Sequence, residues 1–187
     1  MTALLRFNGV TCVRGGRTLF EDLDLALLPG EALLVTGPNG CGKSSLLRLA
    51  AGLLRGACGT IERVDAALAD DALALDRELP LARALGFWAK LDDAFPDEAL
   101  DAMGLTPLAD VPVRFLSTGQ ARRARFARVI ASGAPLWLLD EPANGLDTDG
   151  LARLNSSIAD HRQAGGAVLA ASHSALAGTW RTLDLVS

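Results

Sequence analysis

Long apolar runs are missing from this chain of 187 residues. A membrane-spanning helix needs about 20 consecutive apolar residues, so their absence excludes a protein with helical spans. The first residues, from Met1 to Arg6, turn polar too soon for the apolar segment of a secretory leader. We therefore expect a protein that stays in the cytosol unless a partner holds it at a membrane.

Basic charge is also scarce. The 18 Lys and Arg residues stand against 22 Asp and Glu residues, which leaves a formal net charge of -4. A general nucleic-acid binder would carry a basic face, so we expect no nucleic-acid partner. The acidic balance does not exclude an anionic ligand, because a glycine-rich phosphate loop creates its own local positive field.

Cysteine occurs three times, at Cys12, Cys41 and Cys58, with no metal-binding spacing. This odd number predicts reduced thiols rather than disulfides. Cys41 would be a reactive thiol if it were accessible, but we favour its interpretation as a small filler residue in a loop.

Half of the residues are hydrophobic, which allows a sizeable core to form. We expect one domain over residues 1–187, with a small helical subdomain inserted at about residues 65–130. Apolar and polar residues alternate in two short runs before residue 28, and this pattern predicts a small antiparallel sheet.

The expected helical subdomain begins with leucines at helix-like spacing between about residues 65 and 109. Pro80 and Pro96 interrupt this pattern. The aromatic pair Phe87 and Trp88 is either core or partner-facing, and core is the favoured interpretation.

A further helix is predicted after Ser117 or Thr118, because either side chain can cap it. Arginines stand among alanines along this helix, and we interpret them as an exposed, solvated face. They are Arg122, Arg123, Arg125 and Arg128.

A complete phosphate-loop pattern, G-x-x-x-x-G-K-[ST], spans residues 37–44. It follows an apolar run that predicts a buried strand and leads into a helix-forming run. In that context the loop amides and the helix N-terminus can cradle a phosphate. Lys43 would hold the β- and γ-phosphates, and the Ser44 hydroxyl would bind Mg²⁺. The expected nucleotide contacts are Gly37, Pro38, Asn39, Gly40, Cys41, Gly42, Lys43, Ser44 and Ser45.

Two later apolar runs also end in functional side chains. The first, residues 136–139, leads into Asp140 and Glu141, and the second ends at His173. The carboxyl ends of parallel strands meet at one edge of a sheet, so we expect these groups beside the phosphate loop. Asp140 would bind Mg²⁺ through a water, Glu141 would be the general base, and His173 would bind the γ-phosphate. The alternatives are a helix-start carboxylate for Glu141 and a polar strand end for His173.

The order of these motifs resembles the ABC-type ATPase family. The signature-like residues 116–120, with Thr118 at a position usually held by Gly or Ala, carry much of this resemblance, together with the segment 144–147. The resemblance implies an α/β P-loop NTPase core with a mainly parallel sheet, an N-terminal antiparallel β subdomain and an inserted helical subdomain. It also implies a homodimer in which two copies enclose two ATP molecules. Ser117 and Gly119 would then contact the γ-phosphate bound to the opposite copy, and Asp147 would communicate across the interface.

Within that family, the chain is most similar to the ATPase subunits of cytochrome c maturation, or haem export, systems. Residues 17–20, 87–88, 133–142 and 165–168 carry this similarity. It implies ATP hydrolysis coupled to transport, with Glu141, His173 and Lys43 catalytic. It further implies integral membrane partner subunits and a peripheral position on the cytoplasmic face of a bacterial inner membrane.

The chain departs from the family pattern at two places. It has no glutamine between Ser45 and Leu116, where the family usually has one that touches Mg²⁺, and Asp70 or Asp71 lies in that region. Arg14 stands where an aromatic residue often stacks on adenine, and a guanidinium can also stack on a base.

Three other functions compete with haem export. They are the ATPase subunit of another ABC transporter, a soluble ABC protein of translation or repair, and a non-hydrolytic nucleotide-gated module. The soluble class usually has two ATPase units or a long coiled coil, which this sequence lacks. The intact Glu141 and His173 disfavour the non-hydrolytic module.

Overall fold

A five-stranded sheet carries the motif-bearing strands in the computed structural model, which describes residues 2–91 and 96–185. The strand order is β5-β6-β7-β3-β8, and β6-β7, β7-β3 and β3-β8 pair in parallel. All five residues of β7 are buried, so both faces of this strand are covered, as its continuous apolar sequence predicts. The strands are β3 (Ala32–Thr36), β5 (Ala66–Ala69), β6 (Leu136–Asp140), β7 (Ala167–Ala171) and β8 (Arg181–Asp184).

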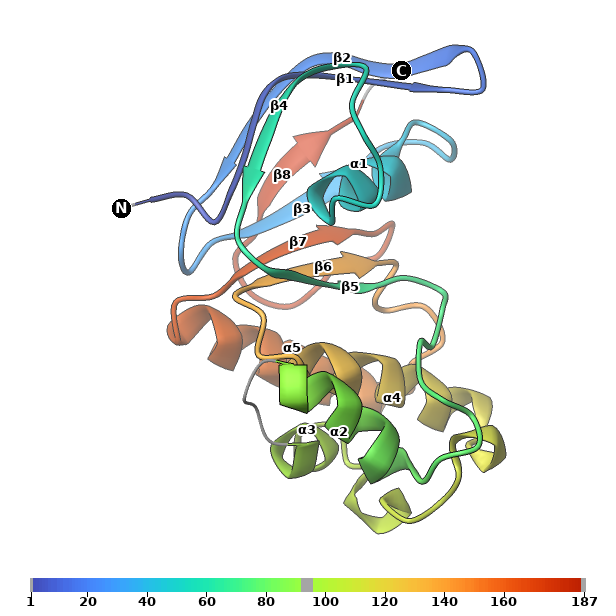
Figure 1. Ribbon diagram of the computed structural model, residues 1–187. Helices are drawn as coiled ribbons and strands as arrows, with labels where there is room; N and C mark the ends of the chain where they lie inside the picture. The colour runs from blue at the N-terminus through green and yellow to red at the C-terminus, as the bar shows by residue number, and fades with distance from the viewer. Residues whose placement is uncertain (1, 92–95, 186–187) are drawn as a thin grey trace. The chain divides into compact units, whose positions relative to one another are not determined.

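The predicted antiparallel sheet is present and has the order β2-β1-β4. Its strands are β1 (Leu5–Arg14), β2 (Arg17–Leu27) and β4 (Cys58–Arg63). Helix α1 (Lys43–Ala50) packs between this sheet and the parallel sheet (Figure 1). Leu46 and Leu47 are completely buried in the shared core, so the helix that follows the phosphate loop is fixed from both sides.

The chain divides into two compact units. The first comprises residues 1–68, 135–142 and 161–187, and the second comprises residues 69–134 and 143–160. The second is mainly helical, and residues 92–95 of the expected helical segment lie outside the described residues. The remaining helices are α2 (Leu81–Leu91), α3 (Pro96–Ala102), α4 (Thr118–Ala131) and α5 (Thr148–Gln163), with short 3-10 turns at Thr106–Leu108 and Val113–Phe115.

The prediction that helix begins at about residue 65 is wrong. Residues 66–69 form strand β5, and the stretch from there to α2 is irregular. Asp70 and Asp76 each accept a hydrogen bond from the backbone N–H two residues later. Such turns compete with helix formation, and Pro80 further disfavours helix in the residue before it. The leucine spacing in this stretch therefore predicted the wrong structure.

Two of the four arginines expected on a solvated face are buried, so that expectation is wrong for Arg125 and Arg128. Helix α4 packs against α2 and α3, which places both guanidinium groups inside the helical unit. The Arg125 Nη1 donates to the main-chain oxygen of Asp70 at 2.7 Å. The Arg128 guanidinium lies 4.9 Å from the ring centroid of Trp88, and burial lowers its pKa.

The core interpretation of the aromatic pair is wrong for Phe87, which is 61% exposed. Trp88 is half-buried, and its Nε1 donates to the Ala74 carbonyl at 3.1 Å. The two rings meet edge to face, so Phe87 contacts Trp88 while most of its own surface stays exposed.

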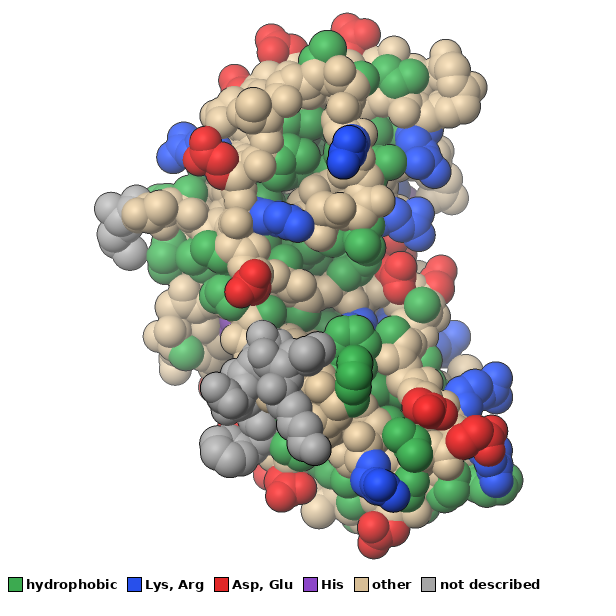
Figure 2. All heavy atoms as spheres, in the orientation of Figure 1, with side chains coloured by type: hydrophobic (Ala, Val, Ile, Leu, Met, Phe, Trp, Pro, Cys, Tyr) green, Lys and Arg blue, Asp and Glu red, His purple; other side chains and the backbone are tan. Residues whose placement is uncertain are grey.

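On the face drawn in Figure 2, acidic and basic side chains are interspersed. Within residues 2–91 and 96–185, no helix has the length and apolar character needed to cross a membrane.

Candidate active site

The residues of the candidate site lie at the carboxyl ends of three neighbouring strands of the parallel sheet. The phosphate loop follows β3, Asp140 ends β6 and is followed by Glu141, and His173 follows β7. These strands are adjacent in the order β6-β7-β3 and run in parallel, so their carboxyl ends lie side by side. They surround a cavity of about 300 Å³. Its lining residues are Leu19, Asn39, Gly40, Gly42, Lys43, Ser44, Ser45, Asp140, Glu141 and His173.

The phosphate loop is held in place by its own lysine. Lys43 is 8% exposed, and its Nζ donates to the carbonyl oxygens of Gly37 at 2.8 Å and Pro38 at 3.1 Å. Burying an ammonium group is costly unless it is hydrogen-bonded, and these two carbonyls satisfy it. The ammonium therefore lies within the loop, where an anionic ligand would meet it.

Gly42 shapes the entry into α1. Its φ of +113° is a conformation that other residues rarely adopt, and a Cβ there would meet the Phe20 ring at 3.2 Å. The helix begins at the next residue, Lys43, so the phosphate loop ends on a helix N-terminus. Cys41 is buried, which agrees with its interpretation as a filler residue.

Glu141 has an uncommon backbone conformation, with a φ of 47° at a residue that is not glycine. Its N–H donates to the Ala171 carbonyl at 2.8 Å, which continues the pairing of β6 with β7. A left-handed conformation at such a residue costs on the order of 1–3 kcal/mol and persists only where the surroundings hold it. The sheet edge thus fixes the direction in which the Glu141 side chain leaves the strand.

His173 bridges two parts of the site. Its Nε2 lies 2.9 Å from Asn39 Oδ1 and 3.5 Å from Glu141 Oε1. Its backbone N–H donates to Glu141 Oε2 at 3.4 Å. Asn39 Oδ1 and the Glu141 carboxylate oxygens can only accept, so a hydrogen on Nε2 is what satisfies these contacts. His173 thus presents a donor at the edge of the cavity, between the phosphate loop and Glu141.

Ser44 and Asp140 line the same cavity and offer a hydroxyl and a carboxylate. Oxygen donors of this kind suit Mg²⁺, which takes few protein ligands and completes its shell with substrate phosphates and water. In the described ranges, no group of three or more His, Cys, Asp and Glu side chains is arranged to hold a metal by itself. The donor set therefore fits a Mg²⁺ ion that arrives with a nucleotide.

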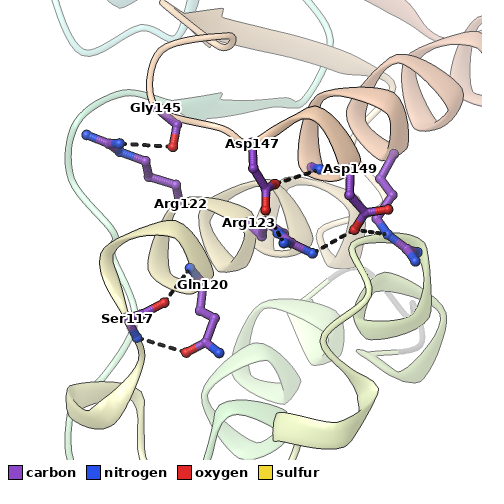
Figure 3. Close-up of polar contacts among 9 residues, drawn as sticks. Ser117, Gln120, Arg122, Arg123, Gly145, Asp147 and Asp149 are labelled. Carbon is purple, nitrogen blue, oxygen red and sulfur yellow. Dashed lines mark hydrogen bonds and ion pairs between the residues drawn. The ribbon is translucent and has the colours of Figure 1, made fainter.

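The residues expected to act from a second copy lie in the helical unit. Ser117 caps α4, because its Oγ accepts from Gln120 N at 3.3 Å while Gln120 Oε1 accepts from Ser117 N at 2.8 Å (Figure 3). This capping box satisfies two donors at the helix start. Gly119 is exposed in the first turn, and a Cβ there would meet nothing within 4 Å outside its own helix and neighbours.

Asp147 also lies in the helical unit, where it caps α5. Its Oδ1 accepts from the Gly150 N–H at 2.9 Å, and its Oδ2 accepts from Arg123 Nη2 at 2.8 Å. The Gly150 N–H is the main cause of a lowered Asp147 pKa, and the positive charge of Arg123 adds to it. Sequence reasoning missed this use of Asp147, although an aspartate just before a helix is a recognised capping signal.

Three further positions are candidates from the sequence, and the structure describes each within its own unit. Arg14 is exposed at the end of β1. Asp70 and Asp71 follow β5, with Asp71 Oδ1 3.9 Å from Arg125 Nη1. Leu19 lines the cavity and was missed, because a lone apolar residue in a predicted strand carries no signal for a ligand.

Residues 20–144 match the family described as ABC transporter. The chain is 62% identical over 181 residues to the cytochrome c biogenesis ATP-binding export protein CcmA of Sphingopyxis alaskensis, which covers 95% of this chain and 93% of that protein. It is 52% identical to the protein of the same description from Zymomonas mobilis, over 98% of this chain and 85% of that protein.

Solved structures resemble the fold. The ATP-binding subunit of an ABC transporter matches with a TM-score of 0.83 at 22% identity, over 91% of this chain and 79% of that one. A metal-chelate type ABC transporter in an inward-facing conformation matches with a TM-score of 0.77 at 29% identity, over 93% of this chain and 74% of that one.

Proposed function

The chain belongs to the ABC transporter family as an ATP-hydrolysing subunit, in the group of cytochrome c biogenesis ATP-binding export proteins, and we propose that it powers haem export for cytochrome c maturation. Family membership implies that it binds ATP and works with membrane subunits. The observation that carries the proposed chemistry is the cavity at three strand ends. It brings Lys43, Glu141 and His173 together around a space of about 300 Å³.

We propose that ATP is cleaved in this cavity by a water molecule. Lys43 exchanges its loop carbonyls for the β- and γ-phosphates, which compensate its charge more strongly. Glu141 accepts a proton from water as the water oxygen bonds to the γ-phosphorus. The bond from that phosphorus to the β–γ bridging oxygen breaks, and ADP and inorganic phosphate leave. The Nε2–H of His173 donates to the γ-phosphate and stabilises its charge.

Ser44 and Asp140 are the residues that we propose to hold Mg²⁺, with Asp140 acting through a bound water. When bound, Mg²⁺ neutralises the charge that develops on the phosphate oxygens. The Ser44 hydroxyl is set by the first turn of α1, and the Asp140 carboxylate by the end of β6.

We propose that two copies of the chain enclose two ATP molecules. Ser117 and Gly119 lie at the N-terminus of α4, which favours an anion because of its free N–H groups and its partial positive charge. The open space around Gly119 leaves room for a phosphate brought by another copy. Asp147 lies in the segment that would face that copy.

We further propose that integral membrane subunits dock on the helical unit, at the cytoplasmic face of a bacterial inner membrane. Phe87 and Trp88 line an apolar cavity of about 330 Å³ together with Ala74, Leu75, Asp76, Leu79 and Ala84. The exposure of Phe87 favours the partner-facing interpretation of the aromatic pair.

The ATPase proposal is tested by Lys43→Ala. Removing the ammonium group should abolish ATP hydrolysis by the purified protein, and near-normal turnover would reject the proposed phosphate site. Arg48→Ala is the matched control, because this exposed cation lies on the same helix and does not line the cavity.

The haem-export proposal is tested by deleting the gene in its own bacterium. Assembly of c-type cytochromes should be lost while haem synthesis continues. The intact gene should restore assembly, and the Lys43→Ala form should not. Normal c-type cytochromes in the deletion strain would point to another ABC transporter instead.

A further inference from the structure

Two consecutive arginines of α4 reach across the helical unit to residues 145–149, which run into the first turn of α5 (Figure 3). Arg122 Nη1 donates to the Gly145 carbonyl at 2.9 Å. Arg123 bridges two carboxylates, because its Nη2 donates to Asp147 at 2.8 Å and its Nη1 to Asp149 at 3.0 Å. Residues 145–149 are therefore tied to α4 at three points by charged donors.

Two glycines leave room for the side chains that make these contacts. A Cβ at Gly145 would collide with the Arg122 guanidinium, and the Gly145 φ of +68° also favours glycine. A Cβ at Gly150 would lie 2.8 Å from Asp147 Oδ1, too close for any other residue without movement. The Arg123 side chain is only 18% exposed, whereas the side chains of Asp147 and Asp149 are 61% and 58% exposed, so the guanidinium group is enclosed while its two carboxylate partners stay in contact with solvent. Both glycines thus leave the space that the arginines and Asp147 occupy.

The Asp147 carboxylate is already engaged within its own chain. One oxygen caps α5 through Gly150, and the other pairs with Arg123. Exchanging these partners for a group on another copy would uncap α5 and leave Arg123 with one ion pair fewer. The carboxylate is therefore better suited to hold its own segment than to reach outward.

We propose that Arg122 and Arg123 are positioning residues that clamp residues 145–149 to the signature helix α4. The clamp makes the N-terminus of α4 and the 145–149 segment move as one body, so both reach an opposing copy in a fixed relative position. Asp147 then acts on the interface through its own loop rather than through a carboxylate contact with the other copy. This inference rests on the proposed ATP-driven homodimer.

Arg123→Ala tests the clamp, and Arg153→Ala is its matched control. Arg153 Nε also donates to Asp149 at 3.0 Å, but it lies on α5 itself and does not tie the segment to α4. Turnover is measured against ATP concentration. ATP-driven dimerisation is measured in Glu141→Gln protein, which should retain the nucleotide.

We expect Arg123→Ala to lower kcat and weaken ATP-driven dimerisation by about tenfold, the size of a typical coupling between sites. ATP binding by the monomer should be unchanged, because the phosphate loop belongs to the other unit. Arg153→Ala should stay within about twofold of the parent protein in both measurements. Arg123→Lys keeps the charge but loses the planar guanidinium group that reaches both carboxylates, so it should retain only part of the parent protein's turnover and dimerisation.

Asp147→Asn provides a test should Arg123→Ala fail to fold, because asparagine caps a helix as well as aspartate but carries no charge. Asp147→Asn should weaken ATP-driven dimerisation as Arg123→Ala does. The double variant should dimerise only slightly less than either single variant, because both substitutions remove the same contact. Normal dimerisation in Arg123→Ala and Asp147→Asn, or equal losses in Arg123→Ala and Arg153→Ala, would overturn the clamp. Failure of the parent protein to dimerise with ATP would instead overturn the proposed homodimer.

Discussion

Replacing Gly119 by alanine should separate the stability of the helical unit from the proposed chemistry. Gly119 lies in the first turn of α4, and a Cβ there meets nothing within 4 Å outside its helix and neighbours. The added methyl group therefore encounters no obstacle inside the described chain. Glycine in a helix interior costs about 0.5–1 kcal/mol relative to alanine. We expect Gly119→Ala to raise the free energy of unfolding by up to that amount.

The same methyl group should impair catalysis. In the proposed dimer, the N-terminus of α4 donates to the γ-phosphate bound by the other copy, and a methyl group at Gly119 would hold that phosphate away. Losing one donor to a transition-state charge typically costs about 10²–10³-fold in kcat. Binding of ATP to the monomer should not change, because the residues around the phosphate loop are untouched.

Gly86→Ala is the matched control for this prediction. Gly86 lies within α2, and a Cβ there also meets nothing within 4 Å. Thermal unfolding without nucleotide should show equal or higher stability for both variants, a shift of about 1–4 °C at most. ATP turnover should fall only in Gly119→Ala. Wild-type turnover in Gly119→Ala would refute the trans contact, and a loss of stability would refute the structural reasoning.

Three further predictions concern the other unit. Glu141→Gln should bind ATP and accumulate an ATP-bound dimer while turnover falls by about 10²–10⁴-fold, and a monomer with normal turnover would reject the base. Leu138→Ala should lower the free energy of unfolding, measured with denaturant, by about 2–5 kcal/mol, because Leu138 is 0% exposed. Leu53→Ala is the control: Leu53 is 70% exposed, so its replacement should change the free energy of unfolding by about 0.5 kcal/mol or less. His161 stacks on Trp137 at 3.9 Å between ring centroids, and burial lowers its pKa. The unfolded chain then binds the proton more tightly, so the stabilisation is complete above about pH 6.5 and is lost as the pH falls through the folded-state pKa. His161→Phe should reduce the fall in the free energy of unfolding below about pH 6.5, measured by denaturant unfolding at a series of pH values. An unchanged fall would show that another group causes it.

The parallel sheet and the gathering of the strand-end groups could be predicted from the sequence. Each group follows an apolar run, and parallel pairing brings the ends of such runs together without any knowledge of side-chain packing. The structure accordingly places Asp140, Glu141 and His173 around the phosphate loop. The roles assigned to them stay predictions.

Packing in the helical unit could not be predicted in the same way. Arg125 is buried because its partner is the backbone of Asp70, 55 residues earlier, and no local pattern announces such a contact. The turns at Asp70 and Asp76 were readable as turn signals, but the leucine spacing favoured a helix. Long-range contacts thus decided the features that local periodicity predicted wrongly.

The glycines of the helical unit differ in whether a side chain of the same unit lies where a Cβ would stand. A Cβ at Gly145 or Gly150 would displace the Arg122 guanidinium group or the Asp147 carboxylate of the same unit, and the φ of Gly145 also favours glycine, so the fold itself gives a reason for both glycines. Gly119 has no such neighbour in the described chain, and its backbone is helical, so the fold gives no reason for glycine there. The same holds for Gly86 in α2, so open space alone does not call for a partner. In the proposed dimer, however, a phosphate held by a second copy has to approach the N-terminus of α4 closely to accept its N–H groups, and Gly119 lies in that first turn. A small residue at Gly119 leaves room for this approach.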